Sequence, residues 1–267
     1  KFKIKKIAQE KKLELLDINE FKLNLNRPFF ILGTGTSINE LTKDEKKFID
    51  SSTSVGLNLI ILSDLNPKFL TLEQDINVPL YFKALEKKNH DFFNKNPNLL
   101  IVDSFFYKDE NIYLLKKYFN NIKIYAIARI LFLNKSNFQG IYNYLFHPLF
   151  LKLLGRGLIY GRSSTVDRII SIAIAAGFKE IVFVGVDLHH SKAFWEDLKF
   201  EDDIETELKN QVSKDPTKPH KTEGEREIPA SEFIKLANNF VTKKSVKFYT
   251  TSKNSKLYSF LPKYKFP

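Results

Sequence analysis

The sequence predicts an α/β fold: a single Rossmann-like domain over residues 1–267, built on a doubly wound, mostly parallel sheet. Short apolar runs alternate with helical patterns along most of the chain, which is typical of a parallel sheet with crossover helices. Residues 162–190 indicate one helix, one tight turn and one buried strand in succession. The length of 267 residues, with 43% hydrophobic side chains, is enough for one large domain with a covering segment.

The chain opens with a pattern typical of a basic amphipathic helix over residues 1–21. Packing on the core and contact with a membrane or partner are both open for this helix. Strands are expected next at residues 28–32, 53–62 and 68–72, because these runs are rich in apolar and β-branched side chains. The second of these strands carries Asn58, and a helix is expected to begin near Thr42.

The middle of the chain continues the alternation of helices and strands. Helices are expected at residues 79–94, at 109–119 and, as a pair, at 138–154, with strands at 99–102 and 122–128. Ser163, Ser164 or Thr165 can cap the next helix, because a short hydroxyl satisfies the N–H groups of a first turn. Gly177 stands where a left-handed C-cap is wanted. Residues 181–186 then form a continuous β-branched and aromatic run, typical of a strand covered on both faces.

The chain becomes polar and charged after this strand. Residues 191–222 are long for a connection inside a compact domain, and such segments are usually functional covers or disordered. We therefore expect a lid at about residues 188–222, which contains Trp195 and His220. A helix at 229–240 and a strand at 246–250 complete the expected fold. The tail mixes lysines with aromatic residues, which indicates a simple extension or a contact with lipid head groups.

Two segments are candidates for a ligand site. The first is Gly33-Thr34-Gly35-Thr36-Ser37, directly after the first buried strand, where glycines let the backbone approach a phosphate or ribose closely. This segment lacks the third glycine of a dinucleotide fingerprint and the lysine of a P-loop, which disfavours a nicotinamide enzyme and an NTPase. A tight turn without a ligand is the alternative.

The second candidate follows the strand at residues 181–186. Ligands of open α/β sheets bind at the carboxyl ends of such strands, which puts Asp187, His189 and His190 at the site. The hydroxyl-rich helix start at residues 162–165 is a candidate anion cradle. The two histidines with Asp187 are also a candidate metal site, although adjacent histidines on an extended segment point in opposite directions.

The composition limits the partners. The net charge of +11 comes mostly from lysines spread along the chain. A solvated surface explains this charge, and attraction to a charged nucleotide donor or to an anionic membrane face is the alternative. No nucleic-acid-binding motif is present, so nucleic acid is not an expected partner. No apolar run reaches the length of a membrane span, so we expect a cytoplasmic protein, with peripheral contact at the inner face of the membrane as a further expectation.

The order of these motifs resembles the bacterial CMP-sialic-acid-dependent sialyltransferases of glycosyltransferase family 42. The resemblance is strongest over residues 162–188 and 220–249 and is only topological over residues 74–161. It implies a GT-A-like variant of the Rossmann-like fold and an inverting, metal-independent glycosyltransferase without a cofactor. The implied donor is a CMP-activated sialic acid or related nonulosonic acid. The implied acceptor is a cell-surface glycan or lipid-linked glycan, such as a lipooligosaccharide, which would place the protein in lipopolysaccharide biosynthesis.

The resemblance also implies roles for single residues. His220 matches the lid histidine that serves as general base in the family. Thr34 and Glu73 occupy positions at which the family has asparagines. The family also has two tyrosines that stabilise the departing phosphate; in this sequence the first position is His189 and the second falls near Trp195. These departures put sialic acid itself in doubt more than glycosyl transfer. The residues implied to bind the donor are Gly33, Thr34, Gly35, Thr36, Ser37, Asn58, Glu73, Arg162, Ser164, Thr165 and Asp187.

Other functions remain open for this sequence. A pterin diphosphokinase-like enzyme and a flagellin-glycosylation factor are similar in the region of the glycine turn. A nucleotide-binding module without turnover is a third alternative, although such a module need not keep a histidine over its pocket. His220 could also be a plain lid residue, and Arg162 could only cap or pair structurally. A homo-oligomer is compatible with the sequence.

Overall fold

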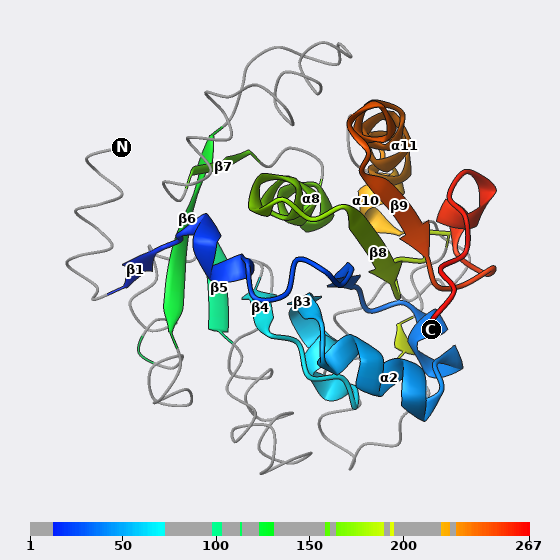
Figure 1. The fold of residues 1–267 in the computed structure, drawn as a ribbon, viewed down its shortest axis with the longest axis horizontal. Coiled ribbons are helices and arrows are strands. Elements are labelled where there is room, and N and C mark those ends of the chain that lie inside the picture. Colours follow the sequence, from blue (N-terminus) through cyan, green and yellow to red (C-terminus); the bar gives the residue numbers. More distant parts are fainter. Residues whose placement is uncertain are drawn as a thin grey trace.

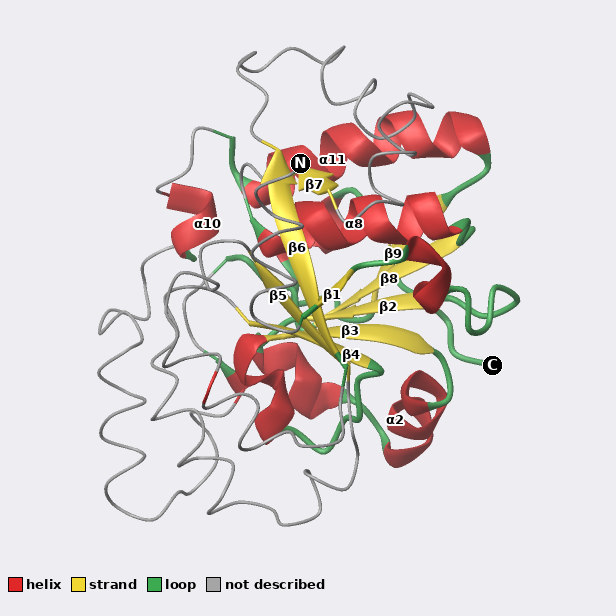
Figure 2. Ribbon diagram, turned by 90° about the vertical axis from the view of Figure 1, so that its left-hand side faces the viewer, coloured by secondary structure: helices red, strands yellow, loops and turns green. Residues whose placement is uncertain are grey.

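The computed structural model describes residues 13–72, 98–102, 113, 123–130, 158–160, 164–189, 193–194, 220–224 and 228–267. These residues form a sheet with helices on both faces, α8 (Thr165–Ala176) and α11 (Ala230–Val241) on one and α2 (Lys43–Asp50) on the other (Figures 1 and 2). Every strand pairing in the described part of the chain is parallel. The predicted α/β, Rossmann-like fold class is confirmed.

The order in which the chain adds strands to the sheet reverses at β2, although the strands stay parallel. From β2 the chain moves through β3 to β6 on one side and then returns to β8 and β9 on the other, in the order β1-β6-β5-β4-β3-β2-β8-β9, with β7 paired to β6. Such a reversal opens a crevice beyond the carboxyl ends of the two central strands. The described strands are β1 (Glu14–Leu15), β2 (Phe29–Leu32), β3 (Thr53–Leu57), β4 (Phe69–Leu72), β5 (Asn98–Val102), β6 (Ile124–Ile130), β7 (Leu158–Tyr160), β8 (Glu180–Val184) and β9 (Lys247–Thr250).

The core lies along the two strands that flank this reversal. All four residues of β2 are buried, and so are the last four of β8, as expected for parallel strands covered on both faces. Phe29 of β2 packs edge-on against Phe178, and Phe183 of β8 packs edge-on against Phe248 of β9. These ring contacts are part of the buried core along β2, β8 and β9.

Helix α8 begins and ends where the sequence predicts. The hydroxyl of Ser164 accepts a hydrogen bond from the N–H of Asp167, whose carboxylate accepts one from the N–H of Ser164. This reciprocal pair satisfies two N–H groups of the first turn. Gly177 has a φ of 99° and closes the helix in the left-handed conformation, which costs glycine little. The predicted cap of residues 163–165 is therefore Ser164 and the predicted C-cap is Gly177.

The remaining described helices are short. Two of them are α-helical, α10 (Lys221–Gly224) and α2. The Thr42 hydroxyl caps α2, which confirms the predicted helix start near Thr42. The others are 3₁₀ turns in the connections between elements and after the last strand. They are η1 (Ile18–Phe21), η2 (Thr36–Glu40), η3 (Asn58–Leu62), η6 (Thr242–Lys244) and η7 (Lys256–Ser259).

Two predictions at the ends of elements are wrong. The helix predicted for residues 1–21 does not extend to residue 21, because β1 and η1 occupy residues 14–15 and 18–21 and bury Ile18 and Phe21 in the core. The strand predicted for residues 53–62 stops at Leu57. Asn58 then has a φ of 48°, which leaves the extended conformation and starts η3.

The C-terminal tail packs on the domain rather than extending from it. The Phe266 ring stacks on the buried Phe30 ring of β2 and meets Phe48 of α2 edge-on. The N–H of Tyr264 donates to the carbonyl of Thr250 at 2.8 Å. The tail therefore packs on β2, α2 and β9, which corrects the simple extension expected for it, and a lipid contact stays a prediction.

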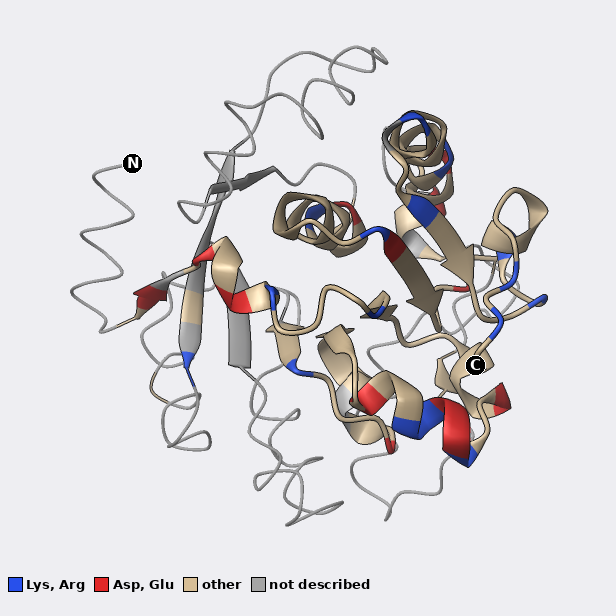
Figure 3. Ribbon diagram, viewed as in Figure 1, with Lys and Arg blue, Asp and Glu red and all other residues tan. Residues whose placement is uncertain are grey.

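Several predictions fall on residues outside the described ones. They are the helices at 79–94 and 138–154, the helix at 109–119 apart from Tyr113, and the lid apart from residues 188–189, 193–194 and 220–222. In the described part of the chain, no helix combines the length and the apolarity that crossing a membrane requires. Figure 3 shows lysines and acidic residues side by side on α2, so this helix does not present a uniformly cationic face.

Candidate functional site

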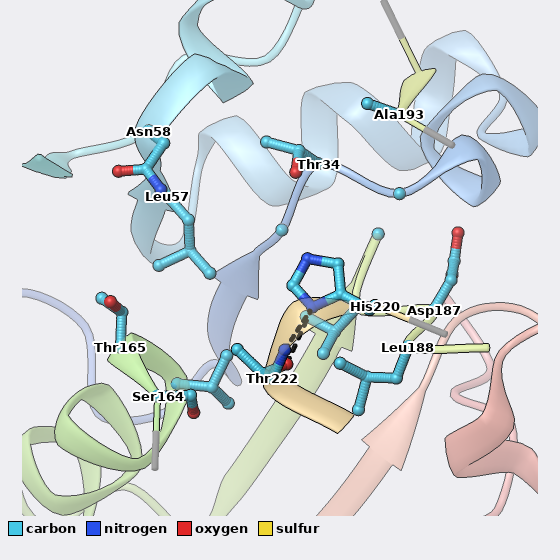
Figure 4. A pocket seen from close by; sticks show the side chains of 15 residues that line it. Thr34, Leu57, Asn58, Ser164, Thr165, Asp187, Leu188, Ala193, His220 and Thr222 are labelled. Atoms are coloured by element: carbon cyan, nitrogen blue, oxygen red, sulfur yellow. Dashed lines mark hydrogen bonds between the residues drawn. The ribbon is translucent and has the colours of Figure 1, made fainter. Parts of the chain in front are cut away.

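A pocket lies beyond the carboxyl ends of β2, β3 and β8, at the point where the strand order reverses (Figure 4). This is where ligands of open α/β sheets bind. Segments far apart in the sequence meet there: the glycine turn, the start of η3, the first turn of α8, the residues that follow β8 and the start of α10. The predicted site residues that line the pocket are Gly33, Thr34, Gly35, Asn58, Ser164, Thr165, Asp187 and His220.

The glycine turn is pressed against the end of β8. The N–H groups of Gly33 and Gly35 donate to the carbonyls of Val184 and Gly185, each at 2.7 Å. A Cβ on Gly33 would stand 2.3 Å from the Gly185 carbonyl oxygen, and one on Gly35 would stand 2.3 Å from Asp187 Oδ2. The glycines are therefore required by the close approach of two backbones, and the N–H groups of Gly33 and Gly35 are already bonded within the protein.

Asp187 holds the glycine turn through hydrogen bonds to Ser37. Its carboxylate is buried and accepts hydrogen bonds from the N–H of Ser37 at 3.0 Å and from the Ser37 hydroxyl at 2.5 Å. Both carboxylate oxygens thus serve the glycine turn, although Asp187 also lines the pocket. The geometry makes Asp187 a support of the wall; a donor-binding contact stays a prediction.

The first turn of α8 faces the pocket with its hydroxyls and backbone. Ser164, Thr165 and Val166 all line it. Side chains already accept from the N–H groups of Asp167 and Arg168, so the N–H groups of Thr165 and Val166, at the positive end of the helix dipole, are the backbone donors that this turn offers a ligand. The hydroxyl of Thr165 also accepts a hydrogen bond from the buried guanidinium of Arg168. This turn is suited to a phosphate or carboxylate, which agrees with the anion cradle expected from the sequence.

Two pocket residues other than glycine have a left-handed backbone. Asn58 has a φ of 48° and Leu188 has a φ of 67°. Asparagine adopts this conformation more readily than most residues, whereas leucine does so rarely. Strained backbone of this kind clusters at binding sites. The break after β3 turns Asn58 into the pocket lining, so the residue predicted on a strand reaches the site from a turn.

His220 enters the pocket from the residue before α10. Its Nδ1 lies 2.8 Å from the Thr222 hydroxyl and accepts a hydrogen bond from the Thr222 N–H at 3.3 Å. The ring thus caps the short helix, in the manner of an N-cap side chain that accepts from the second N–H of the helix. Figure 4 shows the ring between Thr34 and Thr222, with Nδ1 toward Thr222.

Glu223 anchors the turn that carries His220. The Glu223 side chain is 3% exposed. Its carboxylate accepts hydrogen bonds from the N–H and the hydroxyl of Ser231 at 2.7 and 2.6 Å, and an ion pair joins it to Lys256. Burial on its own raises the pKa of the Glu223 carboxyl, but the hydrogen bonds from Lys256 and Ser231 outweigh it and hold this pKa below its usual value. The N–H of Lys256 donates to the Asp187 carbonyl at 2.9 Å, which ties the anchor to the glycine wall.

Not every predicted residue reaches the pocket. His189 is exposed, its Nδ1 lies 3.2 Å from the Asp187 carbonyl, and it is not among the pocket residues. The contact with a departing phosphate that the resemblance implied stays a prediction. Thr36 and Ser37 belong to η2 and do not line the pocket. Glu73, Arg162, His190 and Trp195 lie outside the described residues.

Some pocket residues were not expected from the sequence. Thr222 and Leu188 lie there, together with Ala193. Ala193 forms a bridge with Gly35, and the N–H of Phe194 donates to the Thr34 carbonyl at 2.9 Å. The hydroxyl two residues after a histidine was the one signal that could have indicated Thr222. The described residues hold no cluster of three or more metal-binding side chains.

The comparisons with known proteins return solved structures alone. No family model and no curated protein matches the chain. The chain is similar to a variant of the sialyltransferase CST-II in complex with CMP, at 15% identity and a TM-score of 0.49 over 89% of this chain and 86% of that chain. It is also similar to the sialyltransferase CstII from Campylobacter jejuni in complex with the substrate analogue CMP-3FNeuAc, at 18% identity and a TM-score of 0.46 over 89% and 86%. At these values a shared activity does not follow, and the function has to come from the chain's own residues.

Proposed function

We propose that the protein is a glycosyltransferase that moves a sialic acid or related nonulosonic acid from a CMP-activated donor to a glycan hydroxyl. The observation that carries the proposal is the meeting of the glycine turn, the first turn of α8 and His220 in one pocket. These are the segments on which the sequence resembles glycosyltransferase family 42. The pocket also lies at the reversal of the strand order, where an open α/β sheet binds its ligand.

The donor's phosphate fits the first turn of α8. Backbone N–H groups and the hydroxyls of Ser164 and Thr165 are donors at the positive end of a helix. Asn58 offers an amide to the nucleotide from the next strand end. Gly33 and Gly35 contribute the close approach of the chain rather than their N–H groups, since these N–H groups bond to β8.

The reaction needs one base and donors for the leaving group. The bond between the anomeric carbon and the phosphate oxygen breaks with its electron pair going to CMP, and the acceptor oxygen bonds to the carbon from the opposite face, with inversion. His220 takes the acceptor's proton, because a neutral imidazole is a base suited to neutral pH. The first turn of α8 stabilises the charge that develops on the departing phosphate.

Metal independence and the absence of a cofactor are part of the proposal. The positive end of α8 supplies charge stabilisation at the phosphate without a cation. Asp187 lines the described pocket, and both oxygens of its carboxylate accept hydrogen bonds from Ser37. Activity should therefore survive EDTA. Complete loss with EDTA, restored by Mg²⁺ or Mn²⁺, would contradict this part.

A panel of nucleotides tests the binding half of the proposal. Thermal unfolding is followed with CMP, CDP, UDP, GDP, ADP and ATP at equal concentrations, because a ligand that binds only the folded state raises the Tm. We expect CMP and CDP to raise the Tm more than the purine nucleotides. A larger shift with ATP would favour the pterin diphosphokinase-like alternative instead.

A measurement of sugar transfer distinguishes a glycosyltransferase from a nucleotide-binding module without activity. CMP release from a CMP-activated nonulosonic acid is measured with and without a glycan acceptor such as a lipooligosaccharide. Binding of CMP without acceptor-dependent release would favour a non-catalytic nucleotide-binding module. The cytoplasmic location, the peripheral contact at the inner membrane face, homo-oligomer formation and the role in lipopolysaccharide biosynthesis remain proposals that follow from this acceptor and from the net charge of +11.

A further inference from the structure

The side chain of His220 has two different partners on Thr222, and they make opposite demands on the ring. The Thr222 N–H can only donate, so its bond at 3.3 Å requires an Nδ1 without a proton. A neutral ring then carries its proton on Nε2. The Thr222 hydroxyl, 2.8 Å from Nδ1, can donate to a bare Nδ1 or accept from a protonated one.

The choice between the two tautomers matters because Nε2 is the ring nitrogen of His220 that faces the pocket. Figure 4 shows Nε2 pointing away from Thr222, toward the side of the pocket where Thr34 lies. A ring with its proton on Nε2 is a hydrogen-bond donor there, whereas a base needs a bare Nε2 and therefore a proton on Nδ1. Of the two Thr222 groups at Nδ1, the hydroxyl is the one that can accept that proton.

We propose that Thr222 is a positioning residue that controls the tautomer of His220. Its hydroxyl accepts from Nδ1–H and makes the base-competent tautomer available, while its N–H favours the other tautomer. The hydroxyl thus acts on His220 as the third group of a catalytic triad acts on its histidine, by orienting the ring and stabilising one protonated form. This role rests on the proposed function as far as catalysis is concerned; the control of the tautomer does not.

The turn is built to hold this arrangement. Glu223, the next residue, is fixed by Ser231 and Lys256, so the backbone N–H and the hydroxyl of Thr222 keep their places beside the ring. Thr222 itself is half-buried. Replacing its hydroxyl by a methyl group of similar size removes one partner of Nδ1 and leaves the N–H that opposes the base-competent form.

The first test reads the tautomer without using activity. Imidazole ¹⁵N shifts are measured by two-dimensional ¹⁵N–¹H NMR on the full chain with ¹⁵N-labelled histidine, and His220→Gln identifies the His220 signals by their loss. We expect wild type to show averaged shifts from exchange between both tautomers, and Thr222→Val to show the Nε2–H form alone. Identical ¹⁵N shifts in wild type and Thr222→Val would overturn the inference.

The second test reads turnover and binding. We expect Thr222→Val to lower kcat by about tenfold to a hundredfold, less than the ~10²–10⁴-fold contribution of a base, with the CMP-induced Tm shift kept. Thr222→Ser, which retains the hydroxyl, should restore both the averaged shifts and kcat, and Thr222→Ala removes the hydroxyl if the valine variant does not fold. An altered tautomer with unchanged kcat would overturn the catalytic role of Thr222. Absence of any CMP-dependent transfer by wild type would instead refute the proposed function and leave the tautomer result standing.

Discussion

The two walls of the pocket are held in different ways. The wall made by the glycine turn and the end of β8 is fixed by backbone hydrogen bonds of 2.7 Å and by the buried pair of Ser37 and Asp187. The opposite wall, the turn of His220, is fixed by side chains: Thr222 holds the imidazole and Glu223 holds the helix. The first wall is thus part of the backbone hydrogen bonding of the sheet, whereas the second is joined to the domain through side chains.

This difference separates stability from chemistry. A change in the sheet wall has to move buried backbone, so it acts on the free energy of unfolding. A change in the His220 turn removes a side chain from a site that can keep its shape, so it acts on turnover or on pH dependence. The following variants test this division, from the largest expected effect to the smallest.

The largest effect is expected for His220→Ala. If His220 is the base, kcat should fall by about 10²–10⁴-fold, the usual contribution of a positioned base. CMP affinity should stay close to that of wild type, because the base acts on the acceptor. Steady-state kinetics with a CMP-activated donor, together with a CMP titration, measures both. Retention of more than about a third of wild-type turnover, far above the loss expected for a base, would show that His220 is not the base.

The sheet wall should respond in stability instead. The Cβ added by Gly33→Ala meets the backbone oxygen and carbon of Gly185 at 2.3 and 2.9 Å, so the strand ends must separate. We expect a loss of about 3 kcal/mol in the free energy of unfolding, at the upper end of overpacking effects, measured in urea.

Gly177→Ala is the matched control for this variant. Its added Cβ meets nothing within 4 Å, but the φ of 99° is unfavourable for alanine, so we expect a cost of about 1–2 kcal/mol. If Gly33→Ala were no more damaging than Gly177→Ala, the close approach of the glycine turn to β8 would not be what requires a glycine.

Asp187→Ala tests the support beneath the glycine turn. The variant leaves the buried N–H and hydroxyl of Ser37 without their acceptor, which should cost about 1–3 kcal/mol. Ser37→Ala, which removes one of the two bonds, should cost less. A large loss of turnover in Asp187→Ala at unchanged stability would instead identify Asp187 as a residue that contacts the donor.

The smallest effect, and the one that depends on pH, is expected for Glu223→Gln. The folded state lowers the pKa of Glu223, so the carboxylate contributes stability that is present above its unfolded pKa and is lost as pH falls through the folded one. Wild type should therefore exceed the variant in the free energy of unfolding at pH 7 by about 1 kcal/mol, because the amide keeps one of the two acceptor oxygens, and the difference should vanish in acid. Urea unfolding at several pH values measures it; a constant difference would contradict the anchoring role of the charged form.

Local rules made much of this protein predictable from its sequence. A hydroxyl before an apolar helix and a glycine after it define α8, because capping depends on neighbours in the chain. Continuous apolar runs define β2 and β8, because a strand buried on both faces has no polar alternation. The strand ends with glycines and Asp187 then indicate the edge of the sheet at which a pocket lies.

The tertiary structure decided which polar groups are available at that edge. Gly33, Gly35 and Asp187 belong to a ligand-site pattern, yet their N–H groups and carboxylate are bonded across the turn to β8 and Ser37, and such partners are distant in the chain. His189 is next to the site in sequence but exposed, and Leu188 before it takes a left-handed φ of 67° that no local pattern predicts for leucine. Thr222 bonds to His220 within one turn of the chain, and it is the contacts of Glu223 with Ser231 and Lys256 that anchor this turn to the rest of the domain. The residues of the site follow from local sequence, but their hydrogen-bond partners follow from the packing of the whole chain.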